Sequence, residues 1–275
     1  MKLNGQNFKI KYPAIMGICN ITKDSFSDGG KSYKSRDALK NIKNMINNGA
    51  TIIDIGAEST KPGSDPISYN QEIKKLDTVL KKLPKNQFII SVDTNKLETQ
   101  EYALKNGAHI INDIYGGNTE LIKLSKKYNN GLILMHTPGP PKIMQQKTTI
   151  YKNVVRDIRN IFLKKLVEID KYKISRNKIW FDPGIGFGKN LNQNIEIMNN
   201  MEKFKFEKCG IVLGSSRKSW INKIDGSDVN MRLGGSIASV LYCLNKGVNI
   251  FRVHDVKETK QAIQIYTKLN VRNFN

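Results

Sequence analysis

The amino-acid sequence predicts a closed (β/α)8 barrel of the TIM type, with an active site at the C-terminal ends of the strands. Eight short runs rich in isoleucine and valine alternate with eight longer amphipathic segments over the 275 residues, and this alternation is typical of a parallel sheet with crossover helices. Several runs are apolar throughout, as expected for strands covered on both faces. The even spacing favours closure over an open doubly wound sheet. Since no linker interrupts it, we predict a single domain over residues 1–275.

The predicted strands are the apolar runs, and they cover residues 14–20, 51–57, 88–94, 109–115, 131–137, 178–182, 210–215 and 249–254. The predicted helices carry apolar residues three or four positions apart, and they cover residues 36–48, 68–83, 96–106, 118–128, 151–172, 192–203, 231–245 and 256–269. Three long segments, 21–35, 58–69 and 137–150, each follow a strand. Barrel enzymes place their working loops there, so we expect these segments to border the site.

A polar residue stands at or just after the end of every predicted strand. In chain order these residues are Asn20, Asp54, Asp93, Asn112 with Asp113, His136, Asp182, Arg217 with Lys218, and His254 with Asp255. A single such residue usually caps a turn or supports a neighbour, but in a barrel all of them share one rim. Convergence on one site explains the full series better, and the sequence therefore predicts an enzyme.

The segment from Lys178 to Lys189 carries the clearest local signal. Its apolar strand ends at Asp182, and Pro183 with three glycines then predicts a tight loop that has few side chains. A carboxylate at the lip of such a loop suits an anchor for a polar, planar ligand. The loop lacks the spacing of a dinucleotide fingerprint and of a P-loop, so neither nucleotide motif is predicted.

The rim residues divide into two chemical sets. Asp93, Asn112 and Asp182 offer hydrogen-bond acceptors and one amide, which suit a heterocycle with amino and ring N–H donors. The second set suits phosphate oxygens or a metal that bridges them, and it contains Asn20, Lys218, Arg252 and His254, with Thr60 nearby. A heterocycle that carries phosphates, with Mg²⁺ to neutralise their charge, fits both sets.

The histidines and cysteines show no metal-binding spacing. His109 opens its strand and is predicted to be structural, whereas His136 fits packing and ligand contact equally well. Cys19, Cys209 and Cys243 are predicted to be reduced, packed thiols, which favours a reducing compartment. No signal-peptide core and no apolar run of membrane-spanning length occurs, so we expect a cytoplasmic protein without a membrane partner.

The formal charge of +21 raises nucleic acid as an alternative partner. Most of the excess is lysine that is scattered through the predicted helices, which favours solvated helix faces over a dedicated nucleic-acid surface. No RNA-binding aromatic motif and no compact arginine-rich run accompanies it. We therefore expect no nucleic-acid partner and keep a basic binding protein as the rival from a different class.

Eight motifs in this chain resemble, in order, those of the dihydropteroate synthase family. They are Met-Gly-Ile-Cys-Asn-Ile-Thr-Lys-Asp-Ser-Phe-Ser-Asp-Gly-Gly at 16–30, Asp-Ile-Gly-Ala-Glu-Ser-Thr-Lys-Pro-Gly at 54–63, Ser-Val-Asp-Thr at 91–94, Ile-Asn-Asp-Ile at 111–114, Leu-Met-His at 134–136, Asp-Pro-Gly-Ile-Gly-Phe-Gly-Lys at 182–189, Ser-Arg-Lys-Ser at 216–219 and Arg-Val-His-Asp at 252–255. The first motif alone is specific, and the resemblance covers essentially the whole chain.

The resemblance implies a barrel that joins 6-hydroxymethyl-7,8-dihydropterin diphosphate to 4-aminobenzoate and releases diphosphate and 7,8-dihydropteroate. It implies pterin contacts from Asp93, Asn112, Asp182 and Lys218, with Met135 as an apolar wall, and a catalytic set of Asp93, Asp182, Lys218, Arg252 and His254. Asn20 would ligate Mg²⁺, and Arg252 with His254 would hold the diphosphate. The remaining substrate contacts would come from Thr60, Phe187 and Ser219 and from loops that carry Phe26, Asp28 and Pro62. A homodimer through the late helices is also implied.

Three positions depart from the family pattern. Lys23 stands where proline is common, Lys61 replaces the usual arginine, and Thr137 stands where methionine is more frequent. Lys61 keeps the positive charge but loses the bidentate fork of arginine. None of the three lies at a pterin contact, so the resemblance to the synthase holds. A pterin-dependent methyltransferase and a barrel that has lost its activity are the alternatives nearest to it.

Overall fold

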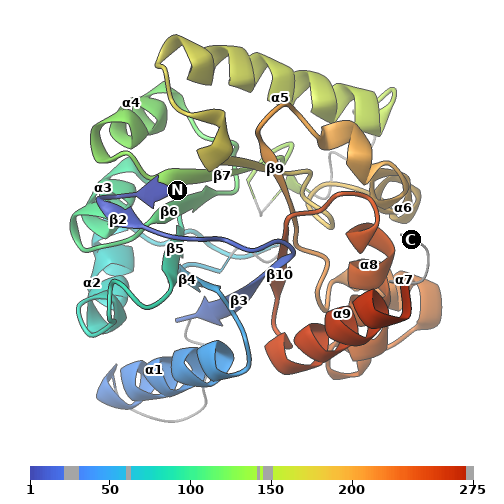
Figure 1. The fold of residues 1–275 in the computed structure, drawn as a ribbon, viewed down its shortest axis with the longest axis horizontal. Helices are drawn as coiled ribbons and strands as arrows, with labels where there is room; N and C mark the ends of the chain where they lie inside the picture. Colours follow the sequence, from blue (N-terminus) through green and yellow to red (C-terminus); the bar gives the residue numbers. More distant parts are fainter. Residues whose placement is uncertain (22–30, 60–62, 141–142, 145–150, 271–275) are drawn as a thin grey trace.

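The structure is a computed structural model that describes residues 1–21, 31–59, 63–140, 143–144 and 151–270. Its centre is a closed barrel of parallel strands in the order β10-β3-β4-β5-β6-β7-β8-β9, and helices surround the strands (Figure 1). The barrel strands are β3 (Ala14–Asn20), β4 (Ile52–Gly56), β5 (Ile89–Asp93), β6 (Ile110–Asp113), β7 (Gly131–Met135), β8 (Ile179–Asp182), β9 (Gly210–Leu213) and β10 (Ile250–Val253). Each lies within one predicted run, so the predicted (β/α)8 barrel is confirmed.

The predicted helices are present with small shifts at their ends. They are α1 (Lys31–Asn47), α2 (Tyr69–Leu80), α3 (Leu97–Lys105), α4 (Thr119–Tyr128), α5 (Val154–Lys171), α6 (Leu191–Asn199), α8 (Leu233–Leu244) and α9 (Val256–Asn270). The helix predicted over 192–203 ends early, at Asn199, and a 3-10 turn, Met201–Phe204, follows it. Two helices begin with a full capping box, from Ser68 to Gln71 and from Asn190 to Gln193, which satisfies N-terminal amides that the helix leaves free.

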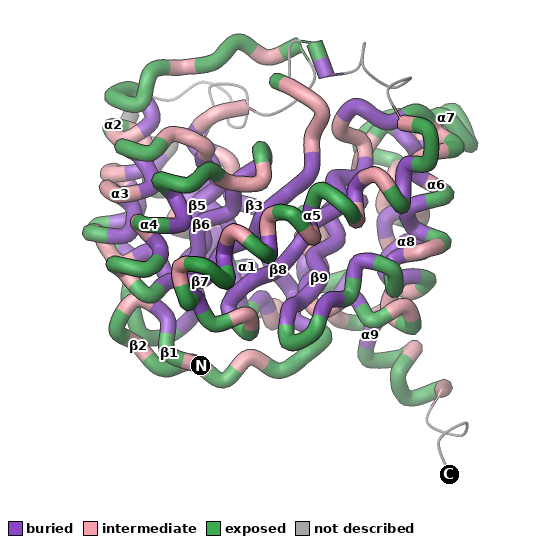
Figure 2. The backbone as a smooth tube through the Cα atoms, turned by 90° about the horizontal axis from the view of Figure 1, so that it is seen from above, coloured by how far each residue is buried: buried purple, intermediate pink, exposed green. Residues whose placement is uncertain are grey.

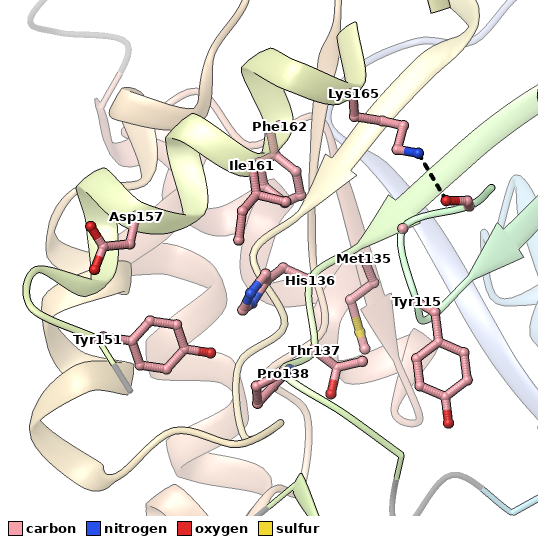
Figure 3. Close-up of a pocket in the computed structure, with 12 residues that line it drawn as sticks. Tyr115, Met135, His136, Thr137, Pro138, Tyr151, Asp157, Ile161, Phe162 and Lys165 are labelled. Atoms are coloured by element: carbon pink, nitrogen blue, oxygen red, sulfur yellow. Dashed lines mark hydrogen bonds between the residues drawn. The ribbon is translucent and has the colours of Figure 1, made fainter. Parts of the chain in front are cut away.

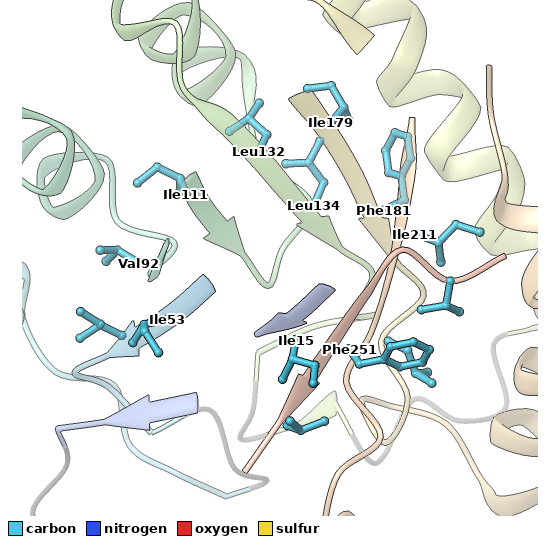
Figure 4. Packing of buried hydrophobic residues seen from close by; sticks show 14 of the residues in the cluster. Ile15, Ile53, Val92, Ile111, Leu132, Leu134, Ile179, Phe181, Ile211 and Phe251 are labelled. Atoms are coloured by element: carbon cyan, nitrogen blue, oxygen red, sulfur yellow. The ribbon is translucent and has the colours of Figure 1, made fainter. Parts of the chain in front are cut away.

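The strands have two apolar faces, which explains why their sequences lack a hydrophobic–polar alternation. Side chains on the outer face, among them Ile53, Leu134, Phe181 and Phe251, belong to one buried cluster with the helices, and in Figure 4 they point away from the barrel axis. Alternate residues fill the lumen with a second cluster that contains Met16, Ile52, Ile89, Ile110, Ile133, Trp180, Val212 and Ile250. This apolar layer fills the lower lumen, beneath the polar rim.

The lower end of the barrel is closed by Trp180 and an N-terminal hairpin. A Cβ on Gly131 or Gly210 would lie 2.9 or 2.1 Å from the Trp180 indole, so two neighbouring strands leave room for this side chain. Its indole N–H donates to the hydroxyl of Tyr12 (3.1 Å). Strands β1 (Lys2–Leu3) and β2 (Gln6–Asn7) lie below the buried barrel strands in Figure 2, and the buried Leu3 joins the lumen cluster.

Two further observations concern the predictions that no segment spans a membrane and that the cysteines are reduced. None of the helices in the described ranges has the length and apolarity needed to cross a bilayer. Cys19, Cys209 and Cys243 are free and buried, as predicted for packed, reduced thiols. Burial raises the pKa of all three thiols, which keeps them protonated and unreactive near neutral pH.

Candidate active site

The register of the parallel strands brings the predicted polar residues to one level of the barrel. Asn20 pairs with Gly56, Gly56 with Asp93, and Asp93 with Asn112. Across the barrel, Met135 pairs with Asp182 in the same way. These residues end their strands on the C-terminal side, so the predicted convergence of strand ends produces one polar rim above the apolar lumen.

Asp54, one layer below the rim, is the centre of the hydrogen-bond network. Its carboxylate is fully buried and accepts from the Ser91 hydroxyl (2.6 Å), the Asn112 amide (3.0 Å) and Nε of Arg252 (2.7 Å). A buried carboxylate requires such partners, because removal from water is otherwise very costly. Asp54 therefore orients two of the residues that the resemblance assigns to substrate.

Arg252 lies between two carboxylates rather than in a separate cationic set. Besides the bond to Asp54, its terminal nitrogen donates to Asp93 (2.8 Å). The division of the rim into an acceptor half and a cationic half, which seemed natural from the sequence, is therefore not kept in space. The guanidinium instead connects the carboxylates of Asp54 and Asp93.

Asp93 differs electrostatically from an ordinary carboxylate. Burial raises its pKa to about 7, and the nearby carboxylates of Asp54, Glu72 and Asp113 act in the same direction against the opposing effect of Arg252. A carboxylate with this pKa exchanges its proton near neutral pH. Such a group accepts N–H donors well when ionised, and it is sensitive to the charge of the ligand placed beside it.

Asp182, Lys218 and Arg252 surround Gly214 from three strands or their following loops. Asp182 Oδ2, Lys218 Nζ and Arg252 Cδ lie 3.5, 3.8 and 3.9 Å from the position that a Cβ on Gly214 would occupy. The missing side chain leaves this space open to a ligand. Burial raises the pKa of Asp182 although Lys218 opposes it, and burial lowers the pKa of Lys218 to about 8 although Asp182 opposes it. Each member of the pair therefore favours the charged form of the other, against the effect of burial.

Lys218 also contacts the glycine loop after β8. Its ammonium donates to the carbonyl of Ile185 (2.5 Å) and lies 4.4 Å from the centre of the Phe187 ring. Lys218 immediately precedes α7 (Ser219–Asp225), a short helix that the sequence analysis did not predict. The first residue of α7 is Ser219, and Trp220 anchors the helix because its indole donates to the Ser215 carbonyl (3.1 Å).

Lys189 is a residue whose role sequence reasoning missed. Its side chain is buried, and its ammonium donates to the carbonyls of Gly184 (2.9 Å), Phe187 (2.8 Å) and His136 (3.3 Å). It also lies 3.2 Å from Nδ1 of His136. Burial lowers its pKa well below the usual range of lysine. The lysine that resembled part of a phosphate loop thus holds its own loop together. The glycine-rich sequence before Lys189 was the signal that could have predicted this role, because it leaves backbone carbonyls open to a buried donor.

His136, which the sequence left open, and His109, which it predicted to be structural, are both neutral. His136 is buried against Lys189, and burial lowers its pKa to about 3. His109 accepts from the backbone amide of Ile90 (2.9 Å) within the barrel wall, and burial lowers its pKa to about 4. The structural role predicted for His109 is therefore confirmed, and His136 supports the glycine loop.

Asn20 and His254 lie at the edge of the site. Asn20 Oδ1 and Asp93 Oδ2 lie 3.3 and 3.8 Å from the position that a Cβ on Gly56 would occupy. His254 follows β10, with an exposed ring whose Nδ1 lies 3.1 Å from the Ser216 hydroxyl. The surrounding protein atoms, together with Arg252 and Arg217, lower its pKa to about 4. It is therefore neutral at physiological pH.

Several predicted residues lie outside the described part of the chain. These are Phe26, Asp28, Thr60 and Pro62, together with the departures Lys23 and Lys61. Within the described residues, no group of three or more histidine, cysteine, aspartate or glutamate side chains could hold a metal ion. The other predicted site residues lie within the described part of the chain, and they are Asn20, Asp93, Asn112, Met135, Asp182, Phe187, Lys218, Ser219, Arg252 and His254.

Comparison with known proteins agrees with this geometry. Residues 16–254 match the family model described as pterin binding enzyme, so the fold and the site define a pterin-binding enzyme. The dihydropteroate synthase of Clostridium beijerinckii is 40% identical over 271 residues, which cover 96% of this chain and 97% of the relative. The chain therefore belongs to the dihydropteroate synthases of this family, which makes it a transferase of folate biosynthesis.

Solved structures support the same assignment. The Yersinia pestis dihydropteroate synthase in a sulfonamide drug complex has a TM-score of 0.89 and 34% identity, with 98% of both chains covered. The Burkholderia cenocepacia enzyme complexed with 7,8-dihydropteroate has a TM-score of 0.85 and 30% identity, with 96% of this chain and 93% of that chain covered. Both similarities extend over nearly the whole chain.

Proposed function

We propose that this barrel condenses 6-hydroxymethyl-7,8-dihydropterin diphosphate with 4-aminobenzoate to give 7,8-dihydropteroate and diphosphate. The observation that carries the proposal is the cluster of polar side chains at one rim, where Asp93, Asn112 and Asp182 are buried and Lys218 is half-buried. The complex of the Burkholderia cenocepacia relative with 7,8-dihydropteroate supports the identity of the product. In this proposal the whole chain, residues 1–275, acts as one domain.

The pterin ring would lie above Gly214, where the backbone leaves open space. The ionised carboxylates of Asp93 and Asp182 would accept its amino and ring N–H groups, and Asn112 offers both a donor and an acceptor. Lys218 would donate to a ring acceptor once the ligand displaces it from the Ile185 carbonyl. Met135, the last residue of β7, would pack against the ring face.

The chemical step would need no side-chain nucleophile. The nitrogen lone pair of 4-aminobenzoate forms a bond to the exocyclic methylene carbon, the carbon–oxygen bond breaks with its electrons on diphosphate, and the nitrogen loses one proton. Positive charge develops on the pterin methylene, and Asp93 and Asp182 would stabilise it. Arg252 and His254 would hold the departing diphosphate. Phe187 and Ser219 would position the aminobenzoate ring, which lowers the entropic part of the barrier.

The described oxygen donors fit Mg²⁺ held mainly by the substrate. Mg²⁺ prefers oxygen ligands and commonly binds through one or two protein groups plus phosphates. Asn20 Oδ1 is such a donor, and it lies beside Asp93 across Gly56. Asn20 would therefore hold the ion, which supplies charge neutralisation to the leaving diphosphate. Phe26, Asp28, Thr60 and Pro62 lie outside the described residues, and their substrate contacts stay predictions.

We infer a homodimer through the late helices. Tyr242 on α8 and Ile265 and Leu269 on α9 are exposed apolar side chains on neighbouring helices, and their burial against a second copy would stabilise association. The three free, buried thiols support a reducing location such as the cytoplasm. Size-exclusion chromatography with light scattering tests the dimer, and a monomeric mass at micromolar concentration would contradict it.

Release of diphosphate tests the proposed reaction. It should require both substrates, increase with Mg²⁺ and accompany recovery of dihydropteroate. Asp182→Ala should abolish turnover, whereas Asp228→Ala, which changes an exposed aspartate, should not. If the folded enzyme binds the pterin without releasing diphosphate, the methyltransferase or inactive-barrel alternative is favoured. Salt-sensitive retention on nucleic acid without pterin binding would instead favour the basic binding protein.

A further inference from the structure

A cavity of about 420 Å³ lies beside the site described above and shares Met135 with it, between the loops after β6 and β7 and helix α5 (Figure 3). Tyr115 lines it from the first loop, His136 from the second, and Phe162 and Lys165 from α5. None of Asp93, Asn112, Asp182 and Lys218 lines it. Cavities of this size commonly hold small molecules.

Much of the cavity wall is apolar. Phe162 and Ile161 present the inward side of α5, and Pro138 and Met135 form the opposite wall in Figure 3. Phe162 is buried and stacks on Phe181 of β8 at 4.6 Å, so this wall is rigidly supported. Such a surface favours an aromatic or otherwise flat apolar body over a strongly hydrated one.

Two hydrogen-bond donors, from Tyr151 and His136, border the cavity. The Tyr151 hydroxyl is buried and has no hydrogen-bond partner among the described residues. Burial raises the pKa of Tyr151, so the hydroxyl keeps its proton. A buried hydroxyl without a partner is destabilising, and a ligand acceptor would remove that cost. The His136 ring packs edge-on against Tyr151 at 5.8 Å, and when Lys189 donates to its Nδ1, its Nε2 carries the proton.

The charged groups at the cavity are already paired. Lys165 donates to the Gly117 carbonyl (2.9 Å) and to Glu168 (2.8 Å). Asp157 accepts from the backbone amides of Lys152 (3.0 Å) and Asn153 (3.1 Å). Neither charge needs a counter-ion from a ligand, so the cavity favours a neutral molecule over a carboxylate or an amine.

We propose that this cavity is a second small-molecule site, which takes a neutral, planar ring that bears a carbonyl oxygen. The oxygen accepts from Tyr151 and from Nε2 of His136, and the ring packs between Phe162 and Pro138. The site is distinct from the pterin site but adjacent to it, because Met135 contributes to both.

Benzamide is a suitable probe, since it combines one ring with a neutral carbonyl. Saturation-transfer NMR and calorimetry on the full chain would measure its Kd for the wild type and three variants. Tyr151→Phe removes the donor without changing the ring. Ile161→Trp fills the cavity from a half-exposed helix position, and Val167→Trp places the same side chain on an exposed position of α5 that does not line the cavity.

We expect Tyr151→Phe to weaken binding about fivefold, which corresponds to the loss of one hydrogen bond of about 1 kcal/mol. Ile161→Trp should abolish binding, and Val167→Trp should leave the Kd unchanged. Saturating 7,8-dihydropteroate should not displace benzamide. The proposal is overturned if wild type does not bind, if the pteroate displaces the probe, or if Tyr151→Phe and Ile161→Trp both retain the wild-type Kd. These binding results do not depend on turnover, so they stand apart from the proposed reaction.

Discussion

Nε of Arg252 lies 2.7 Å from Oδ2 of Asp54, although the two residues are 198 positions apart in the chain. The ion pair connects β10 to β4 across the intervening strand β3, directly beneath the rim. Because Asp54 is fully buried and also bonds Ser91 and Asn112, one carboxylate on β4 connects to side chains of three other strands, β5, β6 and β10. The closure of the barrel and the shape of the site therefore depend on the same group.

Asp54→Asn should lower both stability and activity. The variant leaves the Arg252 guanidinium paired with Asp93 but without Asp54, so the cost should lie near the lower end of the roughly 3–5 kcal/mol lost when a buried ion pair is broken. Denaturant unfolding would measure this loss. Asp170→Asn is the matched control, because Asp170 forms an exposed pair with Arg176 (2.6 Å) whose removal costs about 1 kcal/mol or less. Equal losses in the two variants would contradict the central role of Asp54.

Lys189→Met should impair the position of Phe187. The substitution keeps an unbranched side chain, one atom shorter, but leaves the carbonyls of Gly184, Phe187 and His136 without their shared donor. We expect KM for 4-aminobenzoate to rise at least tenfold with a smaller change in kcat, together with a lower Tm. Lys205→Met, at an exposed position, should change neither value. A fall in kcat at constant KM would argue against the positioning role.

Gly184→Ala should be far more destabilising than Gly226→Ala. Both glycines have a positive φ, +73° and +75°, so the backbone cost of about 1 kcal/mol is shared. A Cβ on Gly184 would lie 2.0 Å from the His136 carbonyl oxygen, whereas nothing lies within 4 Å of one on Gly226. The difference between the two Tm values isolates the clash. Similar Tm values would mean that the loop moves away without cost.

The pH dependence of kcat/KM should follow the ionisation of Asp93 and Lys218. Asp93 must be ionised to accept N–H donors, so activity should rise as pH passes its pKa of about 7. Lys218 must be protonated to donate, so activity should fall as pH passes its pKa of about 8. The expected profile is a narrow bell. Asp93→Asn should retain only weak activity and lose the acidic limb, and an unchanged limb would assign it to another group.

The fold was predictable because each strand leaves a mainly apolar run in the sequence, with one face in the lumen and the other beneath a helix. The β1–β2 hairpin was not predictable, since strands of two residues leave no period. Helix α7 could not be recognised from hydrophobic periodicity, because it has seven residues and begins inside a polar motif. The early end of α6 at Asn199 is a local switch to a 3-10 turn that hydrophobic periodicity does not distinguish.

The members of the site were predictable from strand ends, but their pairings were not. Asp93 and Asp182 could be found because carboxylates ended apolar runs. The height of each residue in the barrel decides which side chains Arg252 can reach, and height depends on strand register. The bonds of Lys189 depend on the path of its own loop, which composition alone does not fix.

The packing of Trp180 against Gly131 and Gly210 has a spectroscopic consequence. The chain contains two tryptophans, and they occupy opposite ends of the barrel: Trp180 lies in the floor beside Tyr12, and Trp220 lies in the helix that begins after Lys218. With one of them replaced by phenylalanine, the emission of the other would report on its own end alone. The molecule thus carries two native fluorophores that can separate ligand-induced changes at the rim from loosening of the base.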